Sequence, residues 1–260
     1  MSNRILIITG MHRSGTSLVS QYLGECGLHI GDNLLEFDAS SPDSAYNGHH
    51  EDKDFFEFHR EIMARVRIYG FPTNELQLFL LKIRHGDRQR AIKLIQSREH
   101  LSQWGWKDPR TTLFLDFWHE LIVSPKYLFV YREPLLVVDS LLRRGTDKHI
   151  LKKPIIALRS WKIFNRQIIN FWNKNKDVCV LYNIADLATN YNCLIDHLNS
   201  KLGIDLQQTD LSKIYRKDAL KQQRTKASQT IKMKYPKEVA ESMEIYRELE
   251  YLSKNESFYN

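Results

Sequence analysis

Short apolar runs alternate with longer amphipathic stretches along the chain. Residues 4–9 (Arg-Ile-Leu-Ile-Ile-Thr) and residues 127–131 (Tyr-Leu-Phe-Val-Tyr) are rich in β-branched and aromatic side chains and predict buried strands. Residues 104–106 and 178–182 predict two further strands. Buried apolar strands separated by helical segments are typical of a mostly parallel sheet with helices on both faces. The pattern therefore predicts an α/β fold with three layers.

Apolar residues recur at helical spacing between the predicted strands. A helix is expected directly after the first strand and its turn, from the spacing of Leu18, Val19, Tyr22 and Leu23. The same periodicity predicts helices over residues 51–69, 88–101, 134–144, 155–173, 186–202 and 236–254. A further helix follows the strand at residues 104–106, and Thr111 or Thr112 is expected to cap it.

Length and composition favour one globular domain. The chain has 260 residues, of which 42% are hydrophobic and 27% charged, as in folded proteins with a sizeable core. We expect residues 1–260 to form a single domain that includes a basic segment at residues 211–234 and a terminal helix at residues 236–254. The apolar runs are far shorter than the roughly 20 residues of a membrane-spanning helix, and no signal peptide is recognised. A soluble, cytoplasmic protein without membrane association is therefore expected.

The positive charge of the chain narrows the choice of partner. The formal net charge is +7, which suits an anionic partner: a nucleic acid, a membrane surface or a phosphorylated small molecule. Charge does not distinguish these partners, so the choice between them rests on motifs.

The strongest motif lies between the first predicted strand and the first helix. Backbone N–H groups of a glycine-containing turn at a helix N-terminus form a concave anion-binding site, so a phosphate group is the expected ligand. The spacing matches a Walker A loop, but Thr16 occupies the position of the Walker lysine, and Arg13 brings the positive charge into the loop instead. The residues expected to bind the phosphate group are His12, Arg13, Ser14, Gly15, Thr16 and Ser17.

Two further strand ends carry charged or hydroxyl side chains. Lys107 follows the second predicted strand, where ligands bind in open α/β sheets, and Asp108-Pro109-Arg110 comes next. Arg132 follows the third strand and Ser140 lies in the next helix, so that one phosphate could accept hydrogen bonds from both. Taken singly, each feature has a structural alternative: a surface salt bridge for Lys107, and a surface pair between Arg132 and Glu133.

Taken together, these elements resemble the sulfotransferases that use 3′-phosphoadenosine 5′-phosphosulfate (PAPS). Residues 13–17 (Arg-Ser-Gly-Thr-Ser) are similar to the 5′-phosphosulfate loop of the family, and Arg132 and Ser140 have the order and spacing of its 3′-phosphate pair. The segments at residues 48–52 and 106–110 are similar to segments of bacterial and carbohydrate-type members. The resemblance implies the P-loop NTPase-like sulfotransferase fold.

The resemblance also implies a reaction. A sulfuryl group would pass from PAPS to the hydroxyl of a small acceptor, with release of 3′-phosphoadenosine 5′-phosphate (PAP). Positioning and charge stabilisation should dominate, and Arg13 and Lys107 are the candidates that stabilise charge on the leaving 5′-phosphate. No metal is expected, because protein cations can take the role that Mg²⁺ has in kinases. A hydroxylated natural product, such as an alkaloid toxin, is the expected acceptor.

The acceptor hydroxyl needs a base. Cytosolic relatives use a His two positions after the Lys, but Pro109 occupies that position here. In carbohydrate and protein-tyrosine members of the family, a Glu after the loop helix is the base. The resemblance therefore makes Glu51 the candidate base here. Other candidates are Asp52, Asp108 and His50. An acidic residue in the first turn of a helix also stabilises that helix against its dipole, so this second interpretation of Glu51 stays open.

The basic segment at residues 211–234 has two interpretations. By default it is a solvated surface. In the family, a C-terminal basic segment closes over the nucleotide, which makes Lys221 or Arg224 a candidate contact of the 3′-phosphate.

Two other functions are compatible with parts of the sequence. A P-loop kinase or NTPase would require Mg²⁺, and both Thr16 and Arg132 disfavour it. A basic nucleic-acid-binding protein would account for the net charge, and it predicts polynucleotide binding that weakens strongly with salt. The sulfotransferase hypothesis expects no nucleic-acid partner.

Overall fold

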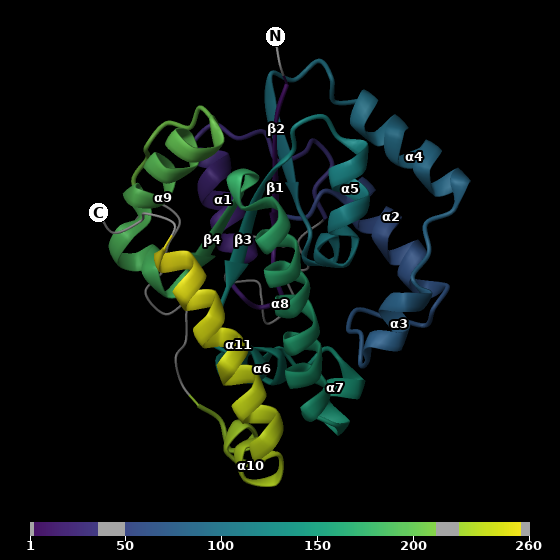
Figure 1. Ribbon diagram of the computed structural model, residues 1–260, viewed down its shortest axis with the longest axis vertical. Coiled ribbons are helices and arrows are strands. Elements are labelled where there is room, and N and C mark those ends of the chain that lie inside the picture. Colours follow the sequence, from purple (N-terminus) through teal and green to yellow (C-terminus); the bar gives the residue numbers. More distant parts are fainter. Residues whose placement is uncertain (1–2, 36–49, 212–223, 256–260) are drawn as a thin grey trace.

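A sheet of four parallel strands lies at the centre of the molecule, in the order β2-β1-β3-β4 (Figure 1). The computed structural model describes residues 3–35, 50–211 and 224–255. The strands are β1 (Arg4–Thr9), β2 (Gln103–Lys107), β3 (Lys126–Tyr131) and β4 (Cys179–Asn183). They confirm the strands that the apolar runs predict and the α/β class with a parallel sheet.

The register of the strands brings their carboxyl ends to one edge of the sheet. Ile8 of β1 pairs with Lys107 of β2 and with Leu128 of β3, and Tyr131 of β3 pairs with Asn183 of β4. The segments that follow neighbouring strands therefore leave the sheet side by side, which is where open α/β folds bind ligands.

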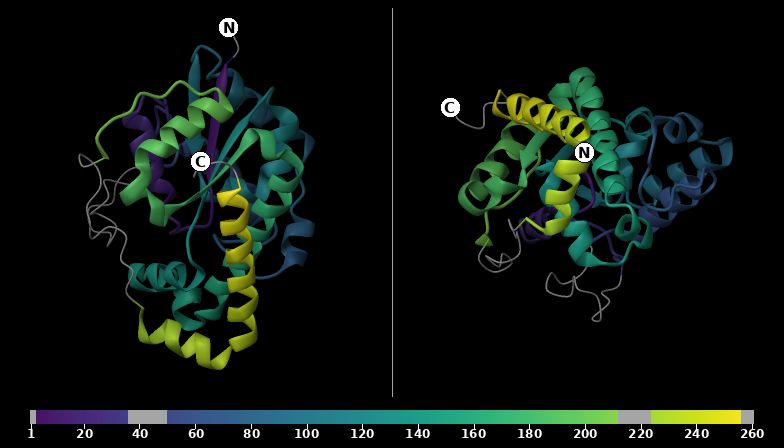
Figure 2. Two further views of the ribbon diagram at one scale, coloured as in Figure 1. Left: turned by 60° about the vertical axis from the view of Figure 1, so that its left-hand side comes forward. Right: turned by 90° about the horizontal axis from the view of Figure 1, so that it is seen from below.

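Side chains of the strands alternate between two hydrophobic clusters, one on each face of the sheet. In β1, Ile5 and Ile7 belong to one cluster, and Leu6 and Ile8 to the other. The cluster of Leu6 and Ile8 is covered by α1 (Thr16–Glu25) and α9 (Leu187–Leu202), which lie together on one side of the sheet (Figures 1 and 2). Helices on the other face bury the larger cluster. The predicted three layers are confirmed.

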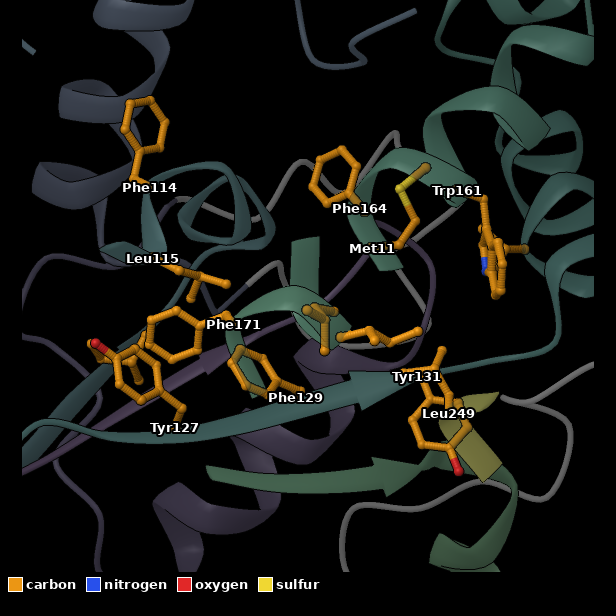
Figure 3. Packing of buried hydrophobic residues seen from close by; sticks show 14 of the residues in the cluster. Met11, Phe114, Leu115, Tyr127, Phe129, Tyr131, Trp161, Phe164, Phe171 and Leu249 are labelled. Atoms are coloured by element: carbon orange, nitrogen blue, oxygen red, sulfur yellow. The ribbon is translucent and has the colours of Figure 1, made fainter. Parts of the chain in front are cut away.

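The larger cluster contains many aromatic side chains (Figure 3). Tyr127 and Phe129 project from β3 toward Phe171, with ring centroids 4.8 Å and 6.0 Å from its ring. Aromatic pairs of this kind stabilise the fold by more than the burial of their apolar surface alone. This packing fixes α8 (Ile155–Asn175), which carries Phe171, against the sheet.

The helices agree in part with the predicted ranges. Four were predicted nearly as observed: α6 (Pro134–Arg144), α8, α9 and α11 (Pro236–Lys254). The predicted helices at residues 51–69 and 88–101 are the shorter α2 (Lys53–Ala64) and the shifted α4 (His85–Gln96). The sequence did not predict α3 (Glu75–Leu80) and α7 (Lys148–Lys152), and α10 (Lys226–Lys234) lies within the basic segment.

The prediction that Thr111 or Thr112 caps a helix is wrong. A 3₁₀ helix, η2 (Pro109–Phe114), comes first, and the Asp108 carboxylate caps it by accepting a hydrogen bond from the Arg110 N–H. Both threonines lie inside this element and are buried: Thr112 Oγ1 lies 2.8 Å from Thr9 Oγ1, and Thr111 Oγ1 accepts a bond from the Trp106 indole. Asp108, a better cap that stands earlier, therefore sets the helix start. The following helix is α5 (Leu115–Leu121).

The C-terminal helix packs lengthwise against α8 (Figure 1). Ion pairs connect the two helices along their exposed sides, among them Lys162 with Glu238 and Glu241, and Arg166 with Glu248. Within the described ranges, no helix has both the length and the apolar composition needed to cross a membrane.

Candidate functional site

The loop between β1 and α1 has a backbone that requires glycine at two positions. Gly10 has φ 152°, and a Cβ there would lie 2.1 Å from the backbone oxygen of Val130. Gly15 has φ 94°, and a Cβ there would lie 2.3 Å from the Ile184 side chain. No side chain caps α1 and its first turn carries no acidic residue, so the N–H groups at its start are available to an anion.

Two buried polar atoms of this loop make no hydrogen bond within the described part of the chain. They are Ser14 Oγ and His12 Nε2. Unsatisfied buried polar atoms are rare and call for a partner. The predicted phosphate-binding loop thus has two polar atoms that can still form hydrogen bonds, which fits a polar ligand.

The structure brings Arg13, Arg132 and Ser140 together. Arg13 Nε donates to Ser140 Oγ at 3.0 Å, and Arg132 Nη1 donates to the backbone oxygen of Arg13 at 3.3 Å. Arg132 is buried, and its own carbonyl accepts a bond of 3.0 Å from the Trp161 indole. The strand end and the helix that carry the predicted 3′-phosphate pair are thus in direct contact with the loop.

Lys107 connects the other side of the loop to Glu51. Its side chain is 1% exposed, and Nζ donates to Ser17 Oγ and to Glu51 Oε1, both at 3.1 Å. Burial lowers the pKa of Lys107, and the Glu51 carboxylate opposes that shift. Three predicted site residues from distant parts of the sequence therefore form one cluster, in which Lys107 and Glu51 are buried and Ser17 is partly exposed.

Glu51 lies within the site and not within a helix. The first residue of α2 is Lys53 and its N-cap is Asp52, so Glu51 precedes the first turn. The interpretation of Glu51 as an acidic first-turn residue is therefore not supported. Its second carboxylate oxygen, Oε2, lies 3.4 Å from Arg110 Nη1, and so each oxygen faces one cation.

The other candidates for the base have structural partners. Asp52 caps α2 by accepting from the Asp54 N–H, and Arg98 donates to it at 2.8 Å. Burial raises the pKa of Asp52, and Arg98 opposes the shift. Asp108 is fully buried and bonded to Arg110 and His59. His50 stands next to Glu51 with φ 48°, and the neighbouring Gly48-His49 lies outside the described residues.

The sequence motifs placed Arg110 at the end of the second strand without giving it a role, and they missed His59. Arg110 contacts both Glu51 and Asp108, and His59 Nδ1 lies 2.8 Å from Asp108 Oδ2. His59 stands four residues after Phe55, on the apolar face of α2. A histidine among core positions of an amphipathic helix is the signal that could have found it, because a buried imidazole needs polar partners.

His12 lies among aromatic rings. Its ring centroid is 5.0 Å from that of Phe71 and 5.9 Å from that of Phe164. Burial, with the nearby Arg110 guanidinium as the next cause, lowers the pKa of His12 well below its usual value. The imidazole is therefore neutral near pH 7.

Arg224 reaches the same strand end as Arg132. Its guanidinium lies 2.8 Å from Glu133 Oε2, and the next residue, Thr225, donates to the Asp139 carboxylate beside Ser140. The basic residues that precede Arg224 in the segment 211–234 lie outside the described residues. Among the described residues, no cluster of three His, Cys, Asp or Glu side chains could hold a metal ion.

Comparison with known proteins identifies the fold. No protein-family model matches the chain, and no curated protein matches it in sequence. Among solved structures, the sulfotransferase domain of the Synechococcus PCC 7002 olefin synthase has a TM-score of 0.53 at 18% identity, covering 100% of this chain and 95% of that one. The sulfotransferase domain from the curacin biosynthetic pathway has a TM-score of 0.55 at 17% identity, covering 96% of this chain and 98% of that one.

A third similar structure is that of sulfotransferase STF1 from Mycobacterium tuberculosis H37Rv. Its TM-score is 0.56 at 13% identity, over 90% of this chain and 76% of that one. At these identities the likeness concerns the fold. The chain therefore has the sulfotransferase fold, as the resemblance of its motifs implies.

Proposed function

We propose that the protein is a sulfotransferase that transfers the sulfuryl group of PAPS to a hydroxyl of a small molecule and releases PAP. The proposed acceptor class is a hydroxylated natural product such as an alkaloid. The sulfotransferase fold supports the reaction class, and the motifs at the carboxyl edge of the sheet support the donor.

One observation carries this proposal. Arg13 is bonded to Ser140 and Arg132 is bonded to the Arg13 carbonyl, so the loop is in direct contact with the predicted 3′-phosphate pair, which supports a single ligand site. A ligand with phosphate groups at two positions of one ribose would use both elements at once. ATP, ADP and AMP lack a 3′-phosphate and would use only one of them.

The proposed chemistry is an in-line displacement at sulfur. A new bond forms between the acceptor oxygen and sulfur, and the bond between sulfur and the bridging oxygen of the 5′-phosphate breaks. The electron pair of the broken bond stays on the 5′-phosphate, where Lys107, next to Ser17, stabilises the negative charge. The proton of the acceptor hydroxyl passes to Glu51.

Glu51 can act as the base while it is held by cations. A carboxylate has about four lone-pair positions on its two oxygens. Lys107 and Arg110 each use one of them. The remaining lone pairs can accept the hydroxyl of an acceptor, and the two cations fix the direction in which the carboxylate points.

A thermal-shift panel with PAP, ADP, ATP and AMP tests the nucleotide assignment. We expect PAP to raise Tm clearly and AMP to have little effect, because only PAP offers a 3′-phosphate to Arg132 and Ser140. A ligand at 100 times its Kd stabilises a protein by about 2.7 kcal/mol. Arg132→Ala should abolish the preference for PAP, whereas Arg159→Ala, at an exposed arginine of α8, should retain it.

Two outcomes would contradict the proposal. Stronger stabilisation by ATP with Mg²⁺ than by PAP would favour a kinase or NTPase, and salt-sensitive polynucleotide binding without selectivity for PAP would favour a nucleic-acid-binding protein. The reaction itself is measured as transfer of radioactive sulfuryl from labelled PAPS to a panel of alcohols and phenols. We expect this transfer to persist in EDTA.

A further inference from the structure

A chain of buried hydrogen bonds runs from the aromatic core to the candidate site. Trp118 Nε1 donates to His59 Nε2 at 2.8 Å, and His59 Nδ1 lies 2.8 Å from Asp108 Oδ2. The side chains of Trp118, His59 and Asp108 have no exposed surface. The proposed mechanism uses none of these three residues.

The partners of His59 determine its protonation. An indole N–H only donates, so Nε2 of His59 is the acceptor, and Nδ1 carries the hydrogen that is donated to Asp108. Burial alone would raise the pKa of Asp108, but Arg110 and the bond from His59 outweigh it and hold that pKa below its usual value. Asp108 is therefore a buried carboxylate anion that accepts from a neutral imidazole.

The other oxygen of Asp108 holds Arg110. Oδ1 accepts from the backbone N–H of Arg110 and from its Nη1, both at 2.9 Å. The same Nη1 lies 3.4 Å from Glu51 Oε2, and the guanidinium carbon is 4.4 Å from the centroid of the Phe56 ring. Arg110 is thus fixed at its main chain, at its guanidinium edge and at its flat face.

Packing alone does not account for a histidine at this position. The His59 ring contacts Phe114, at a centroid distance of 4.8 Å, and Trp118. An apolar side chain would fill that space without the cost of burying two ring nitrogens. Asp108 alone would also cap η2 without a histidine behind it.

We propose that Trp118, His59 and Asp108 form a positioning relay that holds the Arg110 guanidinium against Glu51. Trp118 determines the tautomer of His59, and His59 determines the direction of the Asp108 carboxylate. Asp108 in turn fixes the position of the Arg110 guanidinium. The catalytic consequence rests on the proposed function: an Arg110 that is fixed in place keeps the Glu51 carboxylate aimed at the acceptor hydroxyl. The orientation of Arg110 itself is independent of that function.

The variant Asp108→Asn tests the relay with little change in shape. An amide oxygen still caps η2, because Asn is as good a cap as Asp. The amide NH₂ that replaces Oδ2 faces the Nδ1–H of His59, so that two donors oppose each other. His59 cannot resolve this by changing tautomer, since its Nε2 would then face the Trp118 N–H as a second donor.

Nuclear magnetic resonance gives a readout that needs no activity. We expect the wild-type spectrum to contain separate, slowly exchanging guanidinium signals of Arg110 and a His59 protonated at Nδ1. In Asp108→Asn the guanidinium signals should merge and the His59 signature should be lost. Adding Trp118→Phe to Asp108→Asn should restore order at His59, because the imidazole can then accept from the introduced amide.

Asp87→Asn is the matched control. Asp87 is likewise buried and holds an arginine, Arg65, through two bonds of 2.6 Å and 2.7 Å, but it lies outside the site. It should lose stability without affecting the Arg110 signals. Unchanged Arg110 signals in Asp108→Asn, or an equal change in both variants, would overturn the relay.

Kinetics separate positioning from folding. With the panel acceptor that wild type sulfates fastest, Asp108→Asn should lower kcat by about 100-fold, the scale of a misplaced catalytic group, with KM for PAPS within about twofold. Asp87→Asn should leave kcat unchanged. An unchanged kcat in Asp108→Asn would refute the catalytic part of the relay. If wild type binds no PAP and sulfates no acceptor, the proposed function fails, while the Arg110 signals still decide whether the relay exists.

Discussion

His12 combines a place in a polar loop with an apolar surrounding. It stands two residues after Gly10, yet its ring lies between those of Phe71 and Phe164. Burial disfavours the charged imidazolium, and the positive charge of Arg110 adds to the effect, so the pKa of His12 is lowered. In the unfolded chain His12 binds a proton near pH 6.5, whereas in the folded protein it binds that proton only at lower pH.

Stability is therefore expected to fall as the pH decreases below about 6.5. Each pH unit below that value should cost about 1.4 kcal/mol at this one residue until the pKa of the folded state is reached. In urea unfolding measured between pH 7 and pH 5, His12→Gln should lose less stability than wild type. The pKa of His197 is also lowered, to about 4, but this residue contributes equally to the pH dependence of the unfolding free energy in wild type and in His12→Gln.

His85→Gln is the control for this prediction. His85 is the exposed first residue of α4, and its replacement should leave the pH dependence as in wild type. Equal slopes for His12→Gln and wild type would show that His12 is protonated without cost in the folded protein.

At the scale of elements, the loop after β1 depends on close contacts with β3 and with the residue that follows β4. Gly10 faces the main chain of β3 and Gly15 faces Ile184, which follows β4. A main-chain oxygen cannot move aside as a flexible side chain can, so the position of Gly10 is the stricter of the two.

Gly10→Ala and Gly27→Ala separate the two costs of a side chain at such positions. Gly27 also has a positive φ, 99°, but a Cβ there meets nothing within 4 Å. We expect Gly27→Ala to lose about 1–2 kcal/mol from backbone strain alone. Gly10→Ala should lose at least about twice as much, because the β3 carbonyl adds a clash. Equal losses in urea unfolding would mean that the turn moves away from β3 without cost.

The elements that the sequence predicted are those whose signal is local. The strands at residues 4–9 and 127–131 are apolar runs that end at a turn, and Pro134 and Gly145 mark the ends of α6. The helix cap after β2 was harder to predict, because Asp108 and Thr111 can both cap a helix. Asp108 is the better cap and stands earlier, and the Thr111 hydroxyl is instead bonded to the Trp106 indole. The short α3 and α7 bury few side chains and leave no clear periodicity.

At the scale of the molecule, residues far apart in sequence meet because of the strand order. Ser17 and Lys107 are 90 positions apart, and their contact depends on β2 lying beside β1 at the matching register. Strand order and register come from packing of the whole chain, so the motifs predicted candidate site residues but not which of them are in contact. The contacts of Arg110 and His59 could not be predicted for the same reason.

The expectation of a single domain makes a prediction for α11. Leu249 of α11 is 0% exposed within the main cluster, whereas Tyr251 on the same helix is 68% exposed. Leu249→Ala should lower the stability of the whole chain by about 2–5 kcal/mol, and Tyr251→Ala should have little effect. Circular dichroism and tryptophan fluorescence should show one shared transition in Leu249→Ala. Two separate transitions would mean that the C-terminal helices unfold as their own unit.

The close contacts of Gly10 and Gly15 restrict where the acceptor specificity of this fold can be changed by mutation. A side chain at Gly10 would push against β3 and one at Gly15 against Ile184, so substitutions at these two positions should destabilise the fold before they alter selectivity. By contrast, α3 and α7 lie beyond the carboxyl ends of the strands (Figure 1), and Leu76, Phe79 and Leu151 on them are exposed. Randomised libraries that seek new acceptors are best confined to these two short helices, where variation leaves the proposed nucleotide site intact.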